Sequence, residues 1–394
     1  MSSESLTLER KRKICFIVTV PITYNCFLKD YAAFLHDTGK YDISLVCRDE
    51  PGLRESLPWY IHYYPVQMSR GVSTDALSSI HEIEHIFKEQ DFSLVQYSTP
   101  NASLYASIAA RRAKIPNRLY CQWGIRYMGF QGTGRIIFKM LEKATCRNSS
   151  FIEVESHGLR EFALKEKLYD PEKSCVVWNG SACGIDLSRY QIEKKADWRA
   201  KVRNHLGIAN DAVVFQFAGR LTADKGINEL LKAYLESDRL CNESHLVISG
   251  GMDDEKTIDK TLLSRAMENE NVHLTGSVSD IEQYYAACDV FVAPSYREGF
   301  GLVVIEAEAM GVPAIVSNVP GQIDAIQPDV TGLTCQVKDV VSLRAAMERL
   351  LSDASLRSRM GRAAADFARE QFGQQVLFDH LESKIDEIIG ADYA

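Results

Sequence analysis

Short apolar runs alternate with longer amphipathic stretches along the whole chain. In the first half, these runs predict strands at 13–20, 42–47, 93–98, 118–123 and 150–156. In the second half, β-branched runs bounded by Gly, Pro or Asp predict strands at 213–219, 245–250, 272–276, 289–295 and 313–318. Helical periodicity fills the intervals between them. Strands that alternate with helices indicate βαβ units, so the pattern predicts an α/β protein with mainly parallel sheets.

Chain length and a change in composition divide this pattern into two halves. The 394 residues are too many for one ordinary core, and the polar stretch 187–205 marks the boundary. We predict one Rossmann-like domain over 1–190, a second over 191–372, and a C-terminal helix over 373–394 that packs back towards the first. Because ligands of open α/β sheets bind at the carboxyl ends of strands, this organisation predicts an enzyme with two sheets facing across a cleft.

The sequence lacks the features of membrane-spanning, secreted and zinc-binding proteins. No apolar stretch approaches the ~18 residues that span a bilayer, and the N-terminus, MSSESLTLERKRK, lacks the apolar core of a signal peptide. The ten cysteines are scattered singly, without a CxxC pair or metal-ligand spacing. We therefore expect a cytoplasmic protein with reduced thiols and neither disulfides nor zinc.

The net charge of −8 is unevenly distributed. Residues 1–190 carry 24 Lys and Arg against 21 Asp and Glu, hence +3, whereas residues 191–394 carry 21 against 32, hence −11. Within 111–147, nine basic side chains accompany one acidic side chain, hence +8. Nucleic acid explains this segment poorly, because the chain is acidic overall and has no nucleic-acid-binding motif. A basic surface that faces the phosphates of a lipid or a substrate fits better.

The segment REGFGLVVIEAEAMG, 297–311, directly follows a predicted strand. Its glycines allow a ligand to approach the backbone closely, and the helix expected to begin near Gly301 offers unpaired N–H groups to a phosphate. Glu306 then lies one to two turns into the helix, where a carboxylate can accept hydrogen bonds from the vicinal hydroxyls of a ribose. Glu298, in the preceding loop, can reach sugar hydroxyls. The alternative is a pair of solvated carboxylates with glycines placed for turns, which the strand–glycine loop–helix context disfavours.

The segment FAGRLTADKG, 217–226, leaves the first strand of the second half. Arg220 and Lys225 are five residues apart across a turn that precedes a helix. Two cations at a strand end can neutralise a diphosphate, Arg with bidentate geometry and Lys as a point charge. A solvated turn in which Asp224 pairs with Lys225 is the alternative. The glutamate motif downstream favours the diphosphate.

With these residues in place, the second half resembles the retaining glycosyltransferases of family 4, which have the GT-B fold. The resemblance rests on GRLTADKG, LVISGG (246–251), the run from LTGSVSD to AIVSN (274–318) and TGLTC (331–335). It implies that Arg220 and Lys225 bind the donor diphosphate, that Glu298 holds the transferred sugar, and that Glu306 holds the ribose. It also implies that Gly299, Phe300, Gly301 and Leu302 hold the sugar and phosphates, and that Gly276, Ser277 and Val278 face the nucleobase.

The first half is similar to a bacterial branch of this family that builds capsular, exopolysaccharide or O-antigen repeats on a polyprenyl diphosphate. The similarity lies in RLYCQWGIRYMGFQGTGRIIFKMLEK (118–143) and VVWNGSACGID (176–186), and it implies that Trp123, Arg126 and Tyr127 face a lipid-linked acceptor. Two segments depart from the family pattern. TVPITYNCF (19–27) lacks the glycine of the loop after the first strand, and Trp123-Gly124 stands where many members have a histidine before a glycine. No catalytic group is therefore assigned to the first domain.

The resemblance implies a retaining transferase that moves a hexose or N-acetylhexosamine from a nucleotide diphosphate sugar, with a UDP-sugar favoured, and that needs no metal or other cofactor. The motif MDDE (252–255) could chelate a divalent ion, but its place after the LVISGG strand favours a solvated acidic loop. Two other functions remain. A sugar-nucleotide epimerase can share this architecture but needs an acid and a base near the sugar, and Trp123 leaves room for a non-catalytic sugar-nucleotide sensor.

Residues 133–147 predict an amphipathic helix with an unusual charge pattern. Four basic residues recur every fourth position and form one stripe: Arg135, Lys139, Lys143 and Arg147. Apolar residues form another face: Ile136, Ile137, Met140, Leu141 and Ala144. Such a helix can lie on an anionic bilayer, which predicts association with the inner face of the cell membrane. The alternative is a helix that packs on its own sheet with a solvated basic face.

Overall fold

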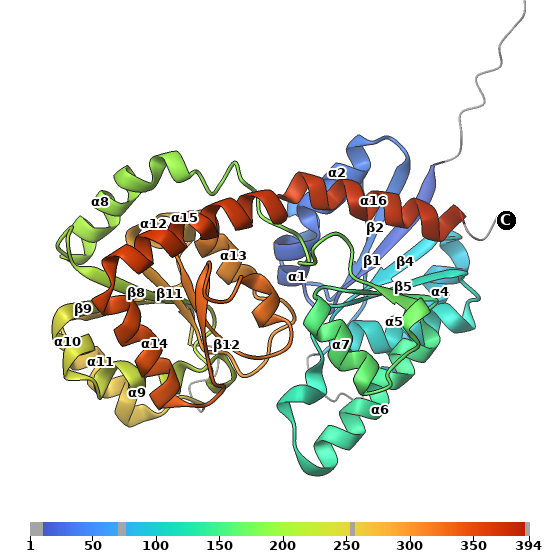
Figure 1. Ribbon diagram of the computed structural model, residues 1–394. Coiled ribbons are helices and arrows are strands. Elements are labelled where there is room, and N and C mark those ends of the chain that lie inside the picture. The colour runs from blue at the N-terminus through green and yellow to red at the C-terminus, as the bar shows by residue number, and fades with distance from the viewer. Residues whose placement is uncertain (1–10, 70–75, 253–256, 391–394) are drawn as a thin grey trace, which may run out of the picture.

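The computed structural model describes residues 11–69, 76–252 and 257–390, and the chain forms two α/β lobes (Figure 1). The first lobe contains a seven-stranded parallel sheet in the order β3-β2-β1-β4-β5-β6-β7. Its strands are β1 Arg12–Ile17, β2 Tyr41–Cys47, β3 Ile61–Pro65, β4 Leu94–Tyr97, β5 Asn117–Gln122, β6 Phe151–Val154 and β7 Ser174–Cys175.

Helices cover both faces of this sheet, because its strands are apolar on both sides. One face packs against α4, α5 and α7 through residues such as Ile83, Ala106 and Leu159. The other face packs against α2 through Tyr31 and Leu35. The helices of this lobe are α1 Pro21–Phe27, α2 Lys29–Asp37, α3 Leu53–Ser56, α4 Ala76–Gln90, α5 Pro100–Arg112, α6 Gly132–Asn148 and α7 His157–Lys165.

The second lobe contains a six-stranded parallel sheet in the order β10-β9-β8-β11-β12-β13. Its strands are β8 Val213–Ala218, β9 Ser244–Ser249, β10 Val272–Gly276, β11 Val290–Ala293, β12 Ala314–Ser317 and β13 Gly332–Cys335. Its helices are α8 Lys195–Leu206, α9 Ile227–Leu235, α10 Asp238–Glu243, α11 Lys260–Glu268, α12 Ile281–Ala287, α13 Leu302–Ala309, α14 Val340–Ser352 and α15 Ala354–Gln371.

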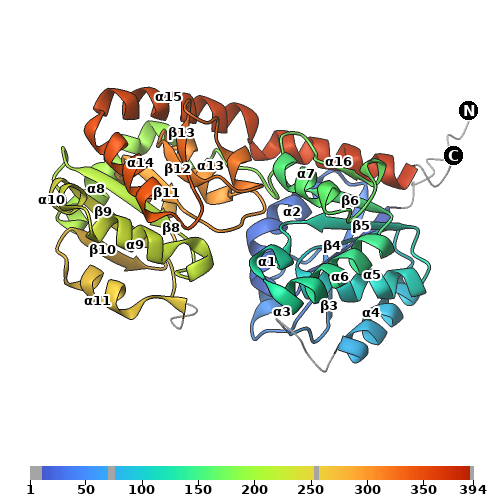
Figure 2. The same ribbon diagram turned by 60° about the horizontal axis from the view of Figure 1, so that its bottom comes forward.

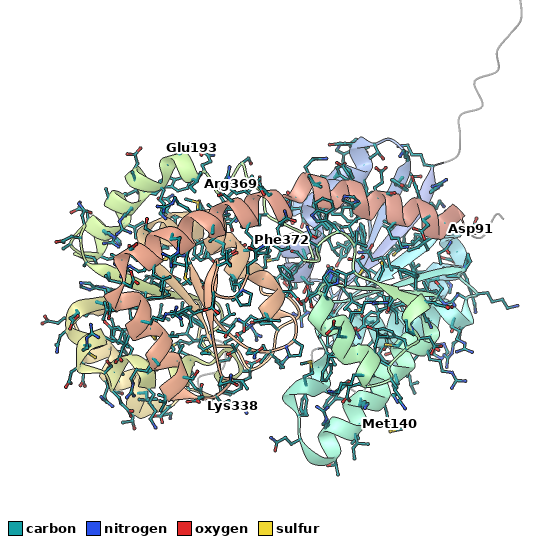
Figure 3. All side chains as sticks on the ribbon, in the orientation of Figure 1. Asp91, Met140, Glu193, Lys338, Arg369 and Phe372 are labelled. Atoms are coloured by element: carbon teal, nitrogen blue, oxygen red, sulfur yellow. The ribbon has the colours of Figure 1, made fainter. Side chains whose placement is uncertain are left out.

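The last helix, α16 (Gln374–Gly390), leaves the second lobe and lies along the first, as Figure 2 shows. Its apolar face, including Leu377, Phe378 and Leu381, shares a core with α2 and the first sheet. The rings of Phe378 and Tyr31 lie 5.0 Å apart. Phe372 stands where the chain passes between the lobes (Figure 3). The C-terminal segment therefore ties the two lobes together through buried apolar contacts.

Several elements differ from those that the pattern of apolar residues predicts. The interval between the first two predicted strands contains two helices, α1 and α2, separated at Leu28 by a non-helical backbone. The edge strands β3 and β7 were not predicted, because β3 is mostly half-buried and polar and β7 has only two residues. The polar boundary stretch contains α8, which ends at Gly207 in a left-handed conformation. These differences lie at sheet edges and helix ends, where apolar periodicity is weakest.

Candidate active site

Two loops of the second lobe, identified separately in the sequence, lie against each other. The 3₁₀ turn η4 (Ala223–Lys225) follows β8, and residues 294–301 follow β11. The N–H of Tyr296 donates to the carbonyl of Asp224 at 2.8 Å. Gly226 has a φ of +75° and lies so close to the Pro294 carbonyl that a Cβ would overlap it. Only glycine fits there, and its lack of a side chain lets the two loops pack against each other.

Lys225 and Glu298 meet directly at this junction. The Nζ of Lys225 lies 2.6 Å from Oε1 of Glu298, and the hydroxyl of Ser295 donates to the same oxygen at 2.8 Å. Both charged side chains are largely shielded from solvent, with 24% and 16% of their surfaces exposed. Screening by water is therefore reduced, and the pair holds the two loops in a defined position.

Asp224 gathers the other cations of the site. Its Oδ2 lies 3.0 Å from the guanidinium of Arg297, and Thr222 donates to its Oδ1 at 2.6 Å. Burial would raise the pKa of Asp224, but the Thr222 hydrogen bond and the charges of Arg297, Lys225 and Arg220 together lower it. Arg220 is exposed and forms no hydrogen bond or ion pair within the described part of the chain. It is a cation free to meet a ligand.

The helix α13 begins where the glycine motif predicts a phosphate seat. Gly301, at its N-cap, has a φ of +111°, and no side chain caps the helix. The first N–H groups, from Leu302 onwards, therefore lack a side-chain acceptor. Phe300 turns away from this opening, because its ring is buried 5.2 Å from that of Phe372. Any contribution of Phe300 to a ligand would come from its backbone.

Glu306 lies in the middle of α13 and is anchored by two tyrosines. The hydroxyl of Tyr285 donates to its Oε2 at 3.0 Å, and Tyr190 also hydrogen-bonds the carboxyl group. Burial raises the pKa of Glu306, and both hydrogen bonds oppose that rise. Burial raises the pKa of Cys26, in α1 of the first lobe, and the nearby charge of Glu306 raises it further. Glu306, the residue predicted to bind the ribose, therefore has a fixed orientation and lies near the first lobe.

The predicted nucleobase loop lies at the same end of the second sheet. Gly276 ends β10 with a φ of +67°, and its carbonyl accepts a hydrogen bond from the N–H of Gly250 at 2.8 Å. Gly276 and Ser277 are exposed, and Val278 is half-buried. Because β10 and β8 are separated only by β9, these residues and η4 share one edge of the sheet.

The first lobe contacts this site at Gly299. The hydroxyl of Ser156 donates to the Gly299 carbonyl at 2.6 Å, and the N–H of Gly158 donates to Oδ2 of Asp324 at 2.8 Å. A Cβ on Gly299 would overlap the carboxyl group of Glu155 and lie 3.0 Å from the carbonyl carbon of Trp123. The carboxyl ends of β5 and β6 therefore meet the loop after β11, so the two sheets face each other here.

Glu155 is a residue of this interface that the sequence did not single out. Its side chain is buried at the end of β6. Burial is the main reason that the pKa of Glu155 lies well above its usual range. The charges of Glu298 and Glu153 raise that pKa further, and the charge of Lys225 opposes the rise. The signal was visible in the sequence as two glutamates inside the otherwise apolar strand FIEVES. Glu155 is thus a first-lobe carboxyl group that lies against the loop carrying Glu298.

Glu153, two residues earlier, gives a prediction for stability against pH. Burial raises the pKa of Glu153 to about 7 from its ordinary value of 4.5, although the Cys121 thiol donates to it at 3.4 Å. Ionisation is therefore disfavoured in the folded state, and stability is lost as pH rises from 4.5 through 7. We expect Glu153→Gln to raise the free energy of unfolding at pH 8 by on the order of 2–3 kcal/mol, with no gain at pH 4.5.

Urea unfolding at pH 4.5, 6 and 8 measures this difference. The matched control is Glu172→Gln, which removes an exposed glutamate from the same lobe. An equal effect of Glu153→Gln at all three pH values would mean that ionisation of Glu153 does not cost stability.

The three residues predicted on the acceptor side occupy different environments. Trp123 is half-buried, its ring lies 5.3 Å from that of Phe27 in a tilted arrangement, and its backbone lies against Gly299. Arg126 is half-buried beside Arg297 of the second lobe. Tyr127 is fully buried, and its hydroxyl donates to Glu166 of the first lobe at 3.4 Å. Its side chain therefore packs within the first lobe, and its predicted place on the acceptor side stays a prediction.

The described residues contain no cluster of side chains that could bind a metal. Within them, no group of three or more His, Cys, Asp or Glu side chains could hold an ion. The acidic residues of the MDDE motif, 253–255, lie outside the described residues. Positive charge at the site comes from the arginine and lysine side chains already described.

Comparisons with known proteins cover both lobes. Residues 13–156 match a family model described as "Glycosyl transferase 4-like", and residues 199–367 match one described as "Glycosyl transferases group 1". The chain is 29% identical over 374 residues to the capsular polysaccharide biosynthesis glycosyltransferase CapM of Staphylococcus aureus, covering 95% of this chain and 97% of CapM. It is 26% identical to UDP-Gal:alpha-D-GlcNAc-diphosphoundecaprenol alpha-1,3-galactosyltransferase of Escherichia coli, covering 80% of this chain and 81% of the relative.

Solved structures share the arrangement of the two lobes. Sucrose-phosphate synthase from Thermosynechococcus elongatus superposes with a TM-score of 0.79 at 19% identity, covering 97% of this chain and all of that structure. WaaG, a glycosyltransferase of lipopolysaccharide biosynthesis, superposes with a TM-score of 0.74 at 16% identity, covering 95% and 99%. At these identities the likeness establishes the GT-B fold.

The sheet topology, the two matched domains and the similarity to CapM over nearly the whole chain agree with one another. The predictions of the fold and of the enzyme class are confirmed, whereas the roles of individual site residues stay predictions. The chain is therefore a glycosyltransferase with the GT-B fold, whose first domain matches the glycosyl transferase 4-like model and whose second domain matches the glycosyl transferases group 1 model.

Proposed function

We propose that this glycosyltransferase moves a sugar from a UDP-sugar to a hydroxyl of a polyprenyl-diphosphate-linked saccharide, with retention, in surface polysaccharide synthesis. The contact between Lys225 and Glu298 carries the proposal, because it joins the predicted diphosphate and sugar ligands at one point. Relatives support the acceptor class. Two are named for transfer to diphosphoundecaprenol-linked sugars, those from E. coli and from Campylobacter jejuni at 26% identity, and the E. coli name includes UDP-Gal.

The proposed chemistry uses fixed positive charge. As the bond from the anomeric carbon to the diphosphate breaks, negative charge grows on the leaving group. Arg220, Lys225 and the uncapped N-terminus of α13 would stabilise that charge, with no cofactor. Glu298 would hold hydroxyls of the transferred sugar and Glu306 the ribose, with the backbone of Gly299–Leu302 between them.

Retention of configuration is assigned to attack from the face that the diphosphate leaves. Glu298 is engaged by Lys225 and Ser295, so it is poorly placed to act as a free nucleophile. Glu155 is buried and held towards its neutral form, which also disfavours nucleophilic attack. The acceptor hydroxyl would therefore attack directly while the departing phosphate oxygen accepts its proton.

A donor and acceptor screen tests the proposed function. The protein is incubated with UDP- and GDP-sugars, with and without a polyprenyl diphosphate sugar. Acceptor-dependent release of the nucleoside diphosphate with formation of an α-linked product from an α-linked donor is expected. Inversion at the anomeric carbon would contradict retention. Altered donor without release would support an epimerase, and binding without turnover would support a sensor.

We further propose that α6 carries the peripheral membrane contact predicted from the sequence. No helix among the described residues is long and apolar enough to cross a bilayer. The apolar side chains of α6 face solvent, with Ile136 62%, Ile137 56% and Met140 65% exposed. Lys139 and Arg135 pair with Glu166 at 2.6 and 3.4 Å. The basic stripe is therefore partly internal, and the apolar face is the surface available to lipid (Figure 3 labels Met140).

Liposome flotation with anionic lipid tests this contact. We expect Ile136→Asp/Met140→Asp to lower the bound fraction by about tenfold or more, because each residue would no longer bury apolar surface in the bilayer. Met267→Asp is the matched control, because Met267 of α11 is 66% exposed on the other lobe. Lys143→Glu/Arg147→Glu, which changes exposed members of the stripe, should reduce binding to anionic vesicles only. Equal flotation of Ile136→Asp/Met140→Asp and wild type would exclude α6.

A further inference from the structure

Arg126 is a half-buried cation that has no acidic partner among the residues the structure describes. Its guanidinium lies over the rings of Phe138 and Phe130, at 4.5 and 5.9 Å from their centroids. Across the described ranges of the chain, it makes no ion pair or hydrogen bond. Burial and the charge of Arg297 both lower the pKa of Arg126. Guanidinium groups that are partly removed from water are normally paired, so Arg126 lacks the anion that its environment favours.

Arg297 brings a second guanidinium to the same place from the other lobe. Its Nε lies 2.8 Å from the position that a Cβ on Gly129 would take, in the 3₁₀ turn η1 (Arg126–Gly129). Its own partner, Asp224, is shared with the charges of Arg220 and Lys225. Three cations therefore share Asp224, one of which, Lys225, also contacts Glu298, and Arg126 adds a further positive charge that has no carboxylate partner among the described residues. Two like charges placed together across a domain boundary are stabilised by a bound polyanion.

We propose that Arg126 and Arg297 bind the diphosphate of the lipid-linked acceptor, at a site separate from that of the donor diphosphate. The assignment rests on the proposed function. Two guanidinium groups can each present paired N–H donors to phosphate oxygens, which suits a diphosphate better than a single charge does.

Chain connectivity favours the acceptor over the donor as the source of this diphosphate. Arg126 belongs to the first lobe, and the exposed apolar face of α6 begins ten residues later at Ile136. In a polyprenyl diphosphate sugar the diphosphate joins the lipid to the saccharide, so its site should lie between the lipid contact and the reacting sugar. Arg297 adjoins Glu298, the proposed sugar ligand. The pair therefore occupies the expected intermediate position.

The site also requires both lobes. Arg126 comes from the first lobe and Arg297 from the second, so the pair exists only when the lobes are in contact, as they are at Gly299 and Ser156. Acceptor binding would then favour the arrangement in which the lobes are in contact, because the diphosphate relieves the repulsion between the two arginines.

Steady-state kinetics with two forms of one acceptor tests the proposal. The acceptors are the polyprenyl diphosphate sugar and the same saccharide as a neutral octyl glycoside. We expect Arg126→Gln and Arg297→Gln each to raise KM for the diphosphate acceptor by about 10- to 100-fold, with KM for the octyl glycoside and the donor within twofold of wild type. The control is Arg12→Gln, because Arg12, at the start of β1 in the first lobe, pairs with Asp386, outside the proposed sites, and should not change these constants.

The other outcomes each decide against the proposal. A rise in donor KM with an unchanged acceptor KM would assign both arginines to the donor diphosphate. An equal loss with both acceptors would assign them a structural role.

A binding measurement separates this proposal from the proposed function. Farnesyl diphosphate is titrated by calorimetry into the full-length protein saturated with UDP, with farnesol as the uncharged control. Wild type should bind farnesyl diphosphate at least tenfold more tightly than either glutamine variant. If that holds while wild type transfers no sugar to any acceptor, the two-arginine site stands and the proposed function fails. Equal binding by wild type and both variants would overturn the site.

Discussion

Arg220→Ala is expected to lower kcat by about 10²–10³-fold without changing the thermal unfolding temperature. Arg220 is exposed and has no ion pair in the region that the structure describes, so its removal breaks no contact that holds the fold. In the proposed reaction its charge meets the leaving diphosphate. Removing one preorganised charge or hydrogen-bond donor from such a site lowers kcat by a factor of this size. Initial rates with saturating donor and acceptor, together with calorimetric unfolding, measure the two effects.

The control for Arg220→Ala is Arg239→Ala. Arg239 also lies in the second lobe and is exposed, but it pairs with Glu243 within α10. That helix leads into the amino end of β9, at the opposite end of the parallel sheet from η4. It should keep wild-type kcat. Full activity of Arg220→Ala would remove Arg220 from the reaction, whatever its effect on donor affinity. If Arg220→Ala lowered the unfolding temperature together with kcat, a structural role would be indicated instead.

Gly321→Ala is expected to lower kcat/KM by about 100-fold and to destabilise the protein by on the order of 3 kcal/mol. Gly321 has a φ of +89°, which disfavours any side chain. An alanine Cβ would overlap the carbonyl oxygen of Gly299 and lie 2.7 Å from that of Glu298. These are backbone atoms of the site loop, so relief requires the loop to move, and Glu298 would lose its position against Lys225.

Gly207→Ala is the control for a positive φ without a collision. Gly207 has a φ of +70° and a ψ of +24°, in the left-handed helical region, whereas Gly321 has a ψ of −57°, and nothing lies within 4 Å of the Cβ position of Gly207. It should cost only about 1–2 kcal/mol of stability and leave kcat/KM unchanged. Urea unfolding and steady-state kinetics of both variants give the comparison. If Gly321→Ala lost no more activity than Gly207→Ala, the packing of Gly321 on residues 298–299 would not position the site.

The second domain was predicted well because local sequence and function coincide there. The β-branched runs are bounded by Gly, Pro or Asp, and each motif lies directly after its strand. Parallel strands align their carboxyl ends, so motifs that follow β8 and β11 must meet, as Lys225 and Glu298 do. The position of Lys225 relative to Glu298 could therefore be expected without knowledge of the side-chain packing.

The first domain was predicted less well because its functional groups come from packing between distant segments. Tyr127 was expected towards the acceptor but is buried against Glu166, and no local pattern distinguishes its side from that of Arg126. In the sequence Glu155 looks like an ordinary strand residue, and only the approach of Gly299 from the other lobe brings it to the predicted sugar site. Likewise, the apolar residues of α6 predicted one face but not that the face is open to solvent.

The sequence by itself determined two parallel α/β domains and the enzyme class, and it supplied the candidate residues for binding the donor. Those features depend on periodicity and on motifs that are local in the chain. Tertiary structure alone decided which first-domain groups reach the second: Glu155 at Gly299, Arg126 at Arg297 and Cys26 at Glu306. The physical reason is that contacts between domains depend on the docking angle of two rigid sheets, which the packing of α16 and the Ser156–Gly299 hydrogen bond help to set and which no short segment encodes.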